Sequence, residues 1–182
     1  MSVEFKWETE FKETEIGEIP RDWEVKRLGE LIQKAKNGST PLTKDKSYWN
    51  GEIPWITSNY LRSLYVFKGD RYVTKKAINE KKTSIANKGV LLFGTRIGIG
   101  NVAIAGRELA FNQDVTAIWL KEGIKGEYLV RLIRSEFYQR LLKDIAEGTT
   151  VGGIDRETLL NLPVVYPFIF RTIPHRYCFI LV

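Results

Sequence analysis

Apolar residues in the earlier part of the chain occur in short runs, whereas later they recur at steps of three and four. Two β-branched runs, Val90–Thr95 and Val102–Ala105, are joined by the glycine-rich segment Arg96–Asn101, a pattern that predicts a β-hairpin. A further strand is expected at Val115–Leu120. Because strands precede helices, the pattern indicates an α+β fold rather than repeated βαβ units.

Helical spacing is clearest in the segment Glu127–Ala146, and Gly148 follows it as a C-terminal cap. The apolar positions of this segment are Tyr128, Leu129, Leu132, Ile133, Phe137, Leu141, Leu142 and Ile145. A second short helix is expected after Asp155, because a carboxylate suits the N-cap position. We therefore predict a strand-rich domain with one long helix, in the C-terminal half, packed on the sheet.

The remaining segments predict shorter elements. Residues 1–15 form an N-terminal arm without a clear period, and Gly17–Pro20 is expected to interrupt regular structure. The run Trp23–Gln33 predicts a short strand or turn leading into a helical turn. Short strands are expected within Tyr60–Val73, and a helical turn within the polar segment Thr74–Lys88.

Composition narrows the class of protein. The chain has 182 residues, of which 43% are hydrophobic and 27% charged, values typical of one globular domain. It lacks the run of roughly 18 apolar residues that a spanning helix needs. Its acidic start lacks the features of a secretory signal, and the single cysteine, Cys178, fits a reducing compartment, so we expect a cytoplasmic protein. The only histidine, His175, gives no basis for a catalytic triad or a histidine metal site.

Charge is distributed unevenly along the chain. Residues 61–100 contain nine basic and two acidic side chains, whereas residues 1–30 contain nine acidic and five basic ones. A basic segment of this kind attracts polyanions, although it can also be a solvated lysine-rich surface. Aromatic and basic residues also interleave around the segment Asn37–Asn59, a mixture that suits nucleic-acid contacts. We expect Trp55 to be core and the polar ends of this segment, Thr40–Lys46 and Thr57–Asn59, to contact DNA.

Three alternatives remain open at this point. The segment Gly98–Ala103 has the form G-x-G-x-x-A, but a β-branched run follows it, so a hairpin turn is favoured over dinucleotide binding. A magnesium-dependent nuclease can be assembled from Asp70, Glu80 and Lys82, provided that the carboxylates lie on adjacent strands. A basic module that binds an acidic protein is the third alternative.

An ordered set of motifs resembles a known family. The set is Gly17–Pro20 with Trp23, Gly38–Pro41, Tyr48–Ile56, Arg96–Gly98, Asn112–Gln113 and the series Gly148–Thr150, Ile154, Leu159, Leu162–Val164 and Pro167. Together these motifs resemble a target-recognition domain in the specificity subunit of type I restriction–modification systems. The resemblance places that domain at residues 16–167.

The resemblance implies a non-catalytic subunit that reads double-stranded DNA. It also implies methyltransferase (modification) and translocase–nuclease (restriction) subunits as partners, to which S-adenosylmethionine, ATP and Mg²⁺ would belong, with no cofactor of this chain's own. Residues 168–182 form an atypical apolar tail where the family's spacer helix is expected. This departure leads us to expect a truncated half-subunit, with a possible homodimer and weak, salt-dependent DNA binding.

Loop position and side-chain chemistry together select eight candidate DNA-binding residues. Amides and hydroxyls can pair with base edges, and cations with phosphates. The candidates are Thr40, Lys44, Ser58, Asn59, Arg62, Arg96, Asn101 and Gln113.

Overall fold

The structure is a computed structural model that describes residues 10–148 and 152–167. Within these residues it has the expected α+β fold, with β1 to β12 preceding α2, α3 and α4 and the short helix α1 lying between β7 and β8. The strands are β1 (Phe11–Thr14), β2 (Gly17–Pro20), β3 (Trp23–Arg27), β4 (Ile32–Asn37), β5 (Trp49–Ile56), β6 (Tyr65–Val66), β7 (Arg71–Val73), β8 (Ser84–Ala86), β9 (Leu91–Gly94), β10 (Val102–Ala105), β11 (Leu109–Phe111), β12 (Val115–Leu120) and β13 (Pro163–Pro167). The helices are α1 (Lys75–Asn79), α2 (Gly126–Ile133), α3 (Glu136–Glu147) and α4 (Arg156–Leu160), with short 3-10 helices η1 (Leu28–Leu31), η2 (Lys46–Tyr48) and η3 (Ser58–Tyr60).

Two sheets form the centre of the fold. A five-stranded sheet has the order β4-β12-β9-β10-β6, and a four-stranded sheet has the order β7-β5-β11-β8. β9 and β10 form the predicted antiparallel hairpin, with Val102 opposite Phe93. Two further antiparallel pairs, β1 with β2 and β3 with β13, lie outside these sheets.

The central strands of the five-stranded sheet, β9 and β10, are buried on both faces. Leu91 and Phe93 of β9 and Ile104 of β10 pack into a core with the helices, η1 and β13. Leu92 and Ala103, which alternate with them, pack into a second core shared with β11 and the end of β5. Strands buried on both faces read as continuous apolar runs, which is why the sequence predicts β9, β10 and β12 well.

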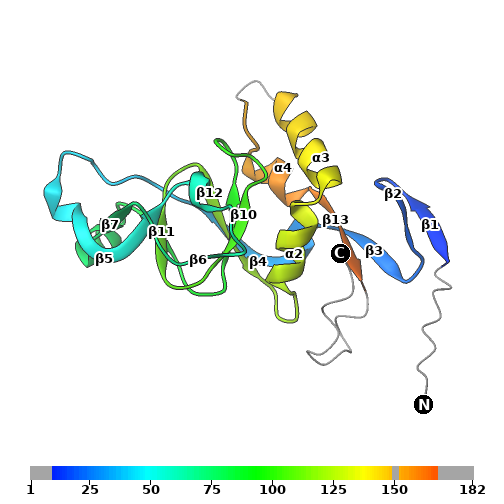
Figure 1. The fold of residues 1–182 in the computed structure, drawn as a ribbon, viewed down its shortest axis with the longest axis horizontal. Helices are drawn as coiled ribbons and strands as arrows, with labels where there is room; N and C mark the ends of the chain where they lie inside the picture. Colours follow the sequence, from blue (N-terminus) through cyan, green and yellow to red (C-terminus); the bar gives the residue numbers. More distant parts are fainter. Residues whose placement is uncertain (1–9, 149–151, 168–182) are drawn as a thin grey trace, which may run out of the picture.

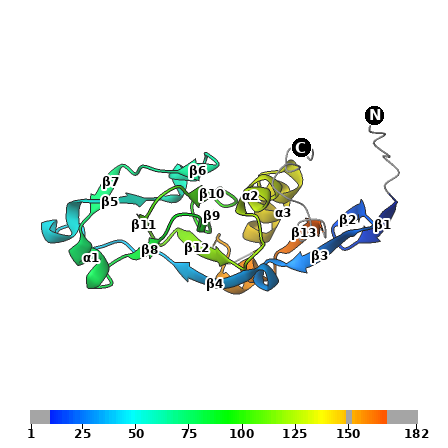
Figure 2. The same ribbon diagram turned by 90° about the horizontal axis from the view of Figure 1, so that it is seen from below.

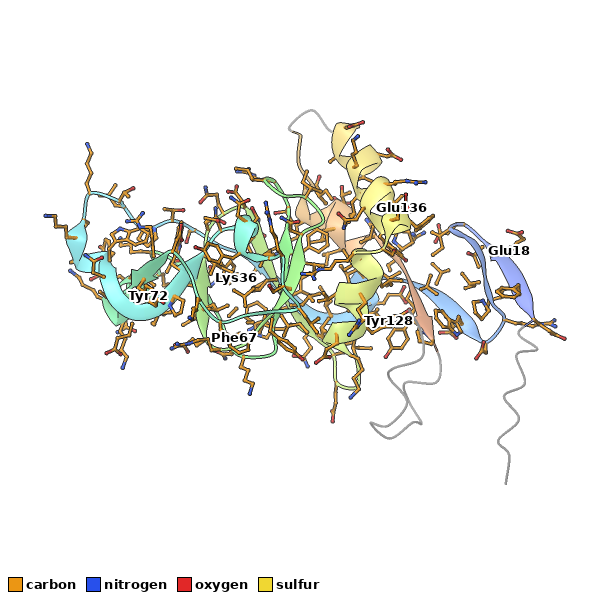
Figure 3. All side chains as sticks on the ribbon, viewed as in Figure 1. Glu18, Lys36, Phe67, Tyr72, Tyr128 and Glu136 are labelled. Atoms are coloured by element: carbon orange, nitrogen blue, oxygen red, sulfur yellow. The ribbon has the colours of Figure 1, made fainter. Side chains whose placement is uncertain are left out.

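The elements are arranged along one long axis. Figure 1 shows β5 and β7 at one end, the five-stranded sheet in the middle with α2 and α3 beside β10, and the β1–β2 hairpin at the other end. The perpendicular view in Figure 2 shows the same order. In Figure 3, Tyr72 of β7 and Glu18 of β2 mark these two opposite ends.

The helical region differs from the prediction of one long helix over Glu127–Ala146. The structure has two helices, because the chain leaves α2 at its C-cap residue Arg134 and becomes extended at Ser135, the N-cap of α3. Apolar spacing continues across this break, so the periodicity did not reveal it. The capping predictions are confirmed: Gly148 ends α3, and the Asp155 carboxylate accepts a hydrogen bond of 2.8 Å from the Thr158 backbone N–H at the start of α4.

The N-terminal prediction is partly wrong. Gly17–Pro20 does not interrupt regular structure but forms β2, and Gly17 supplies a positive φ of 97° in the turn that follows β1. The predicted boundary between an N-terminal arm (1–15) and a domain (16–167) falls in this turn. Nothing in the structure tests that boundary, which remains a prediction. The predicted tail, 168–182, lies outside the described residues.

Candidate nucleic-acid interface

Four loops meet at one edge of the two sheets. β4, β9 and β12 pair so that Asn37 and Gly94, each the last residue of its strand, lie opposite Thr116 and Val115 at the start of β12. β5 and β11 run parallel and end at the same level, with Ile56 beside Phe111. The loops 38–45, 57–64, 95–101 and 112–114 therefore share one side of the fold, which we call the loop edge. Figure 1 shows the loop between β9 and β10 projecting beyond the sheet.

Thr40 and Gln113 meet on the loop edge although they are far apart in sequence. The Thr40 hydroxyl donates a hydrogen bond of 2.7 Å to Oε1 of Gln113, and both residues are exposed. The backbone fixes this contact, because Ser39 N donates to Phe111 O over 3.1 Å. Trp55 also stabilises this loop, because its indole Nε1 donates to Ser39 O over 3.4 Å.

Asn59 and Asn101 also lie on the loop edge. Asn101 Nδ2 donates to Ser58 O over 3.3 Å, so the β9–β10 loop is bonded to η3, where Asn59 is exposed. The Ser58 side chain points inward: the residue is only 1% exposed, and its Oγ has no partner among the described residues. Ser58 is thus buried although it lies in a loop, and its contact with DNA remains a prediction.

The predicted cations are divided between two regions. Arg96 is exposed in the β9–β10 loop, whose Gly98 and Gly100 have positive φ values of 65° and 79°. This loop is the hairpin turn that the sequence favoured, since a strand rather than a helix follows it. Arg62 lies beside Asn101 in a hollow of the loop edge. Lys44 is exposed further along its loop, in the turn just before η2.

Sequence reasoning missed two side chains that hold the loop edge in place, Arg134 and Gln139. Arg134, at the break between α2 and α3, donates to Leu61 O (3.1 Å), Ser63 O (3.0 Å) and Val102 O (2.7 Å from Nη2 and 3.1 Å from Nε). Gln139 Nε2 donates to Gly100 O over 3.1 Å. Burial lowers the pKa of Arg134, although a guanidinium stays protonated in proteins. Nothing in the helical pattern separated these two positions from ordinary surface residues.

The interleaved aromatic residues belong mainly to the scaffold. Trp49 and Trp55 are 5% and 6% exposed and pack edge to face with ring centroids 5.3 Å apart. The Arg71 guanidinium lies 3.4 Å from the centroid of the Trp49 ring, so this cation stacks within the protein. The expectation that Trp55 is core is confirmed.

The residues proposed for a nuclease do not form a metal site. Asp70 precedes β7 and Glu80 caps the end of α1, so the two carboxylates do not lie on adjacent strands. Glu80 accepts a hydrogen bond of 2.7 Å from the Tyr48 hydroxyl, which raises the pKa of Tyr48 to about 12. Across residues 10–148 and 152–167, no three histidine, cysteine or acidic side chains are grouped to hold a metal. The nuclease alternative is not supported.

The helices give no sign of membrane insertion. In the part of the chain that the structure describes, none is long and apolar enough to cross a bilayer.

The fold is a mixed α+β domain in which two sheets pack together and helices cover one side. Its polar side chains gather on loops at one edge of the sheets, a common position for binding residues. The chain belongs to the family of the type I restriction modification DNA specificity domain, whose family model matches residues 20–169.

Relatives in Methanocaldococcus jannaschii are similar over nearly the whole chain. The type I restriction enzyme MjaIX specificity subunit is 44% identical over 168 residues, covering 91% of this chain and 39% of that subunit. The putative type I restriction enzyme MjaX specificity subunit is 49% identical over 180 residues, covering 91% of this chain and 40% of that subunit. The chain thus spans about two fifths of the length of the curated relatives it matches.

Solved structures share the fold at low sequence identity. A chain from a study of complex assembly and conformational transition in a type I R-M system has a TM-score of 0.63 and 18% identity, covering 82% of this chain and 35% of that chain. The HsdS subunit from Thermoanaerobacter tengcongensis has a TM-score of 0.59 and 14% identity, covering 86% of this chain and 36% of that subunit. These likenesses show the α+β fold predicted from the sequence.

Proposed function

We propose that this chain binds a specific sequence of double-stranded DNA as a specificity component of a type I restriction–modification complex. The observation that carries the proposal is membership of the DNA specificity domain family across residues 20–169. The loop edge supports it, because hydroxyl, amide and guanidinium groups converge there on a rigid two-sheet scaffold.

The loop edge offers both kinds of contact that DNA recognition requires. Asn59, Thr40 and Gln113 can pair with base edges in a groove. Because Oε1 of Gln113 accepts the Thr40 hydroxyl, the Nε2 hydrogens of Gln113 can donate to an acceptor such as purine N7. The cations Arg62, Arg96 and Lys44 suit the phosphates, which set affinity and its salt dependence.

The proposal assigns no catalytic step to this chain. Methyltransferase and restriction subunits would be its protein partners, and S-adenosylmethionine, ATP and Mg²⁺ would bind to them. We propose the cytoplasm as the location, because a protein that reads cellular DNA with those partners would act there. A homodimer is also proposed, because two linked copies would engage two half-sites and linked binding raises the overall affinity.

Selection of bound sites from random duplex DNA tests the proposed function. The 182-residue chain is mixed with a random-sequence duplex library, with and without the matching modification subunit. We expect one short sequence to be enriched, and its binding to weaken steeply as salt concentration rises. A folded chain that enriches no sequence in either mixture would refute the proposal. Magnesium-dependent cleavage that Asp70→Ala abolishes would instead favour a nuclease.

A further inference from the structure

A hollow of about 460 Å³ lies on the loop edge, between η3, the β9–β10 loop and the break between α2 and α3. None of the residues that line it is acidic. They are Leu61, Arg62, Gly100, Asn101, Arg134 and Gln139. The hollow therefore brings two guanidinium groups and two amides together without a carboxylate to neutralise them.

Arg134 is held in this hollow with part of its guanidinium unused. Nε and Nη2 donate to the carbonyls of Leu61, Ser63 and Val102, which fixes the plane of the group. Nη1 makes no hydrogen bond to the residues that the structure describes. A guanidinium fixed on one side, with donors free on the other, is preorganised to bind an anion, because little side-chain entropy remains to be lost.

Arg62 and Asn101 complete the ligand set. The exposed Arg62 makes no hydrogen bond or ion pair within residues 10–148 and 152–167, so its full donor set is available. Asn101 is held in place through its Nδ2 bond to Ser58 O, and Gln139 fixes the loop next to it by donating to Gly100 O. Two arginines suit a backbone phosphodiester, because its single negative charge is shared by two oxygens and guanidinium groups can donate to both of them.

We propose that this hollow is a phosphate pocket in which Arg62 and Arg134 together bind one phosphate group of the DNA backbone. Asn101 lines the same pocket, and Gln139 is a positioning residue that holds the β9–β10 loop against it. This inference rests on the proposed DNA binding and deepens it. Binding here would fix the register of the duplex, so that the neighbouring Asn59, Thr40 and Gln113 meet base edges.

Salt titration of DNA binding tests the pocket. The full chain is titrated with a fluorescent duplex of mixed sequence over a range of salt concentrations, as wild type and as Arg62→Gln. Loss of one phosphate contact is expected to lower the slope of log affinity against log salt by about 0.9. Affinity at low salt should fall roughly tenfold, because a charge-assisted hydrogen bond is lost. Arg131→Gln, an exposed arginine on α2 outside the hollow, is the matched control and should keep the wild-type slope.

A double-variant cycle tests whether the two arginines share one phosphate. Arg134→Lys keeps the positive charge. A lysine ammonium, however, cannot donate to the three carbonyls and to a phosphate at the same time, as the planar guanidinium can. If both arginines bind one phosphate, the double variant should lose less affinity than the sum of the two single losses. Independent, additive losses would overturn the shared pocket.

Other outcomes separate this proposal from the proposed function. Wild-type binding that Arg62→Gln leaves unchanged in affinity and slope would overturn the pocket alone. No DNA binding by the wild-type chain, even at low salt, would overturn the proposed function together with it. Arg62 is exposed and makes no hydrogen bond or ion pair within the described residues, so Arg62→Gln should fold and still tests the pocket if Arg134→Lys is poorly folded.

Discussion

Gly38 occupies a position where the backbone passes too close to a neighbouring strand for any side chain. An added Cβ would lie 2.1 Å from Asn112 O, 2.3 Å from Phe111 O and 2.6 Å from Phe111 Cδ2. Two of these atoms are backbone oxygens, which cannot rotate away as the end of a side chain can. We therefore expect Gly38→Ala to push the start of the 38–45 loop away from the end of β11.

The size of the effect follows from what this movement breaks. Gly38 N donates to Val115 O and Ser39 N donates to Phe111 O, both over 3.1 Å, and each such bond contributes about 1 kcal/mol. Residual overpacking typically costs about 1–3 kcal/mol more. The free energy of unfolding should therefore fall by about 3–5 kcal/mol, a large share of the total for one domain.

Urea denaturation followed by tryptophan fluorescence measures this loss. Gly148→Ala is the matched control, because its nearest neighbours would be 3.5 and 3.6 Å away and its φ is −74°. That variant should be as stable as wild type or more stable by about 0.5 kcal/mol. If Gly38→Ala and Gly148→Ala unfold at the same urea concentration, the reasoning from the close backbone approach is refuted.

Two further changes probe the core and the stacked cation. Burial raises the pKa of Tyr138 to about 12, above the ordinary 10.0, so its stabilising effect is complete below pH 10 and is lost as the pH rises to 12. The urea midpoint should fall over that interval, and an unchanged midpoint would contradict it. Arg71→Gln removes the cation stacked on Trp49 and should lower the free energy of unfolding by about 1 kcal/mol and alter the tryptophan emission. Tyr72→Gln, an exposed neighbour, serves as the control and should do neither.

The strands that are buried on both faces were predicted best from the sequence. β10 and β12 have the predicted bounds because both faces of each strand are covered, which makes the strand one apolar run. β4 was missed, since its buried residues Ile32 and Ala35 are three apart, a spacing more typical of a helix. A register shift between Trp119 and Leu120 of the partner strand accompanies this spacing. Such a shift depends on tertiary pairing that a single sequence does not reveal.

The sequence indicated which types of side chain the candidate site contains, but not which of them lie next to one another. Loop position correctly indicated that Thr40 and Gln113 are exposed. Their hydrogen bond depends on how the residues after β4 meet the end of β11, where Ser39 N donates to Phe111 O. The burial of Ser58 was not predictable, because a loop residue can turn its side chain inward and only the packing decides this. Arg134 was hidden because a helix break leaves no signal when apolar spacing continues through it.

The pairing of β3 with β13 has a consequence for how the chain folds. Trp23–Arg27 pairs with Pro163–Pro167, so nearly the whole described chain lies between two strands that must meet. Contacts between residues so distant in sequence are slow to form, because the entropy of closing the loop is lost before the contacts stabilise it. During synthesis, β3 cannot pair until β13 has left the ribosome, whereas the β9–β10 hairpin can form much earlier. We therefore expect the central sheet to form first and the β3–β13 pair to close last.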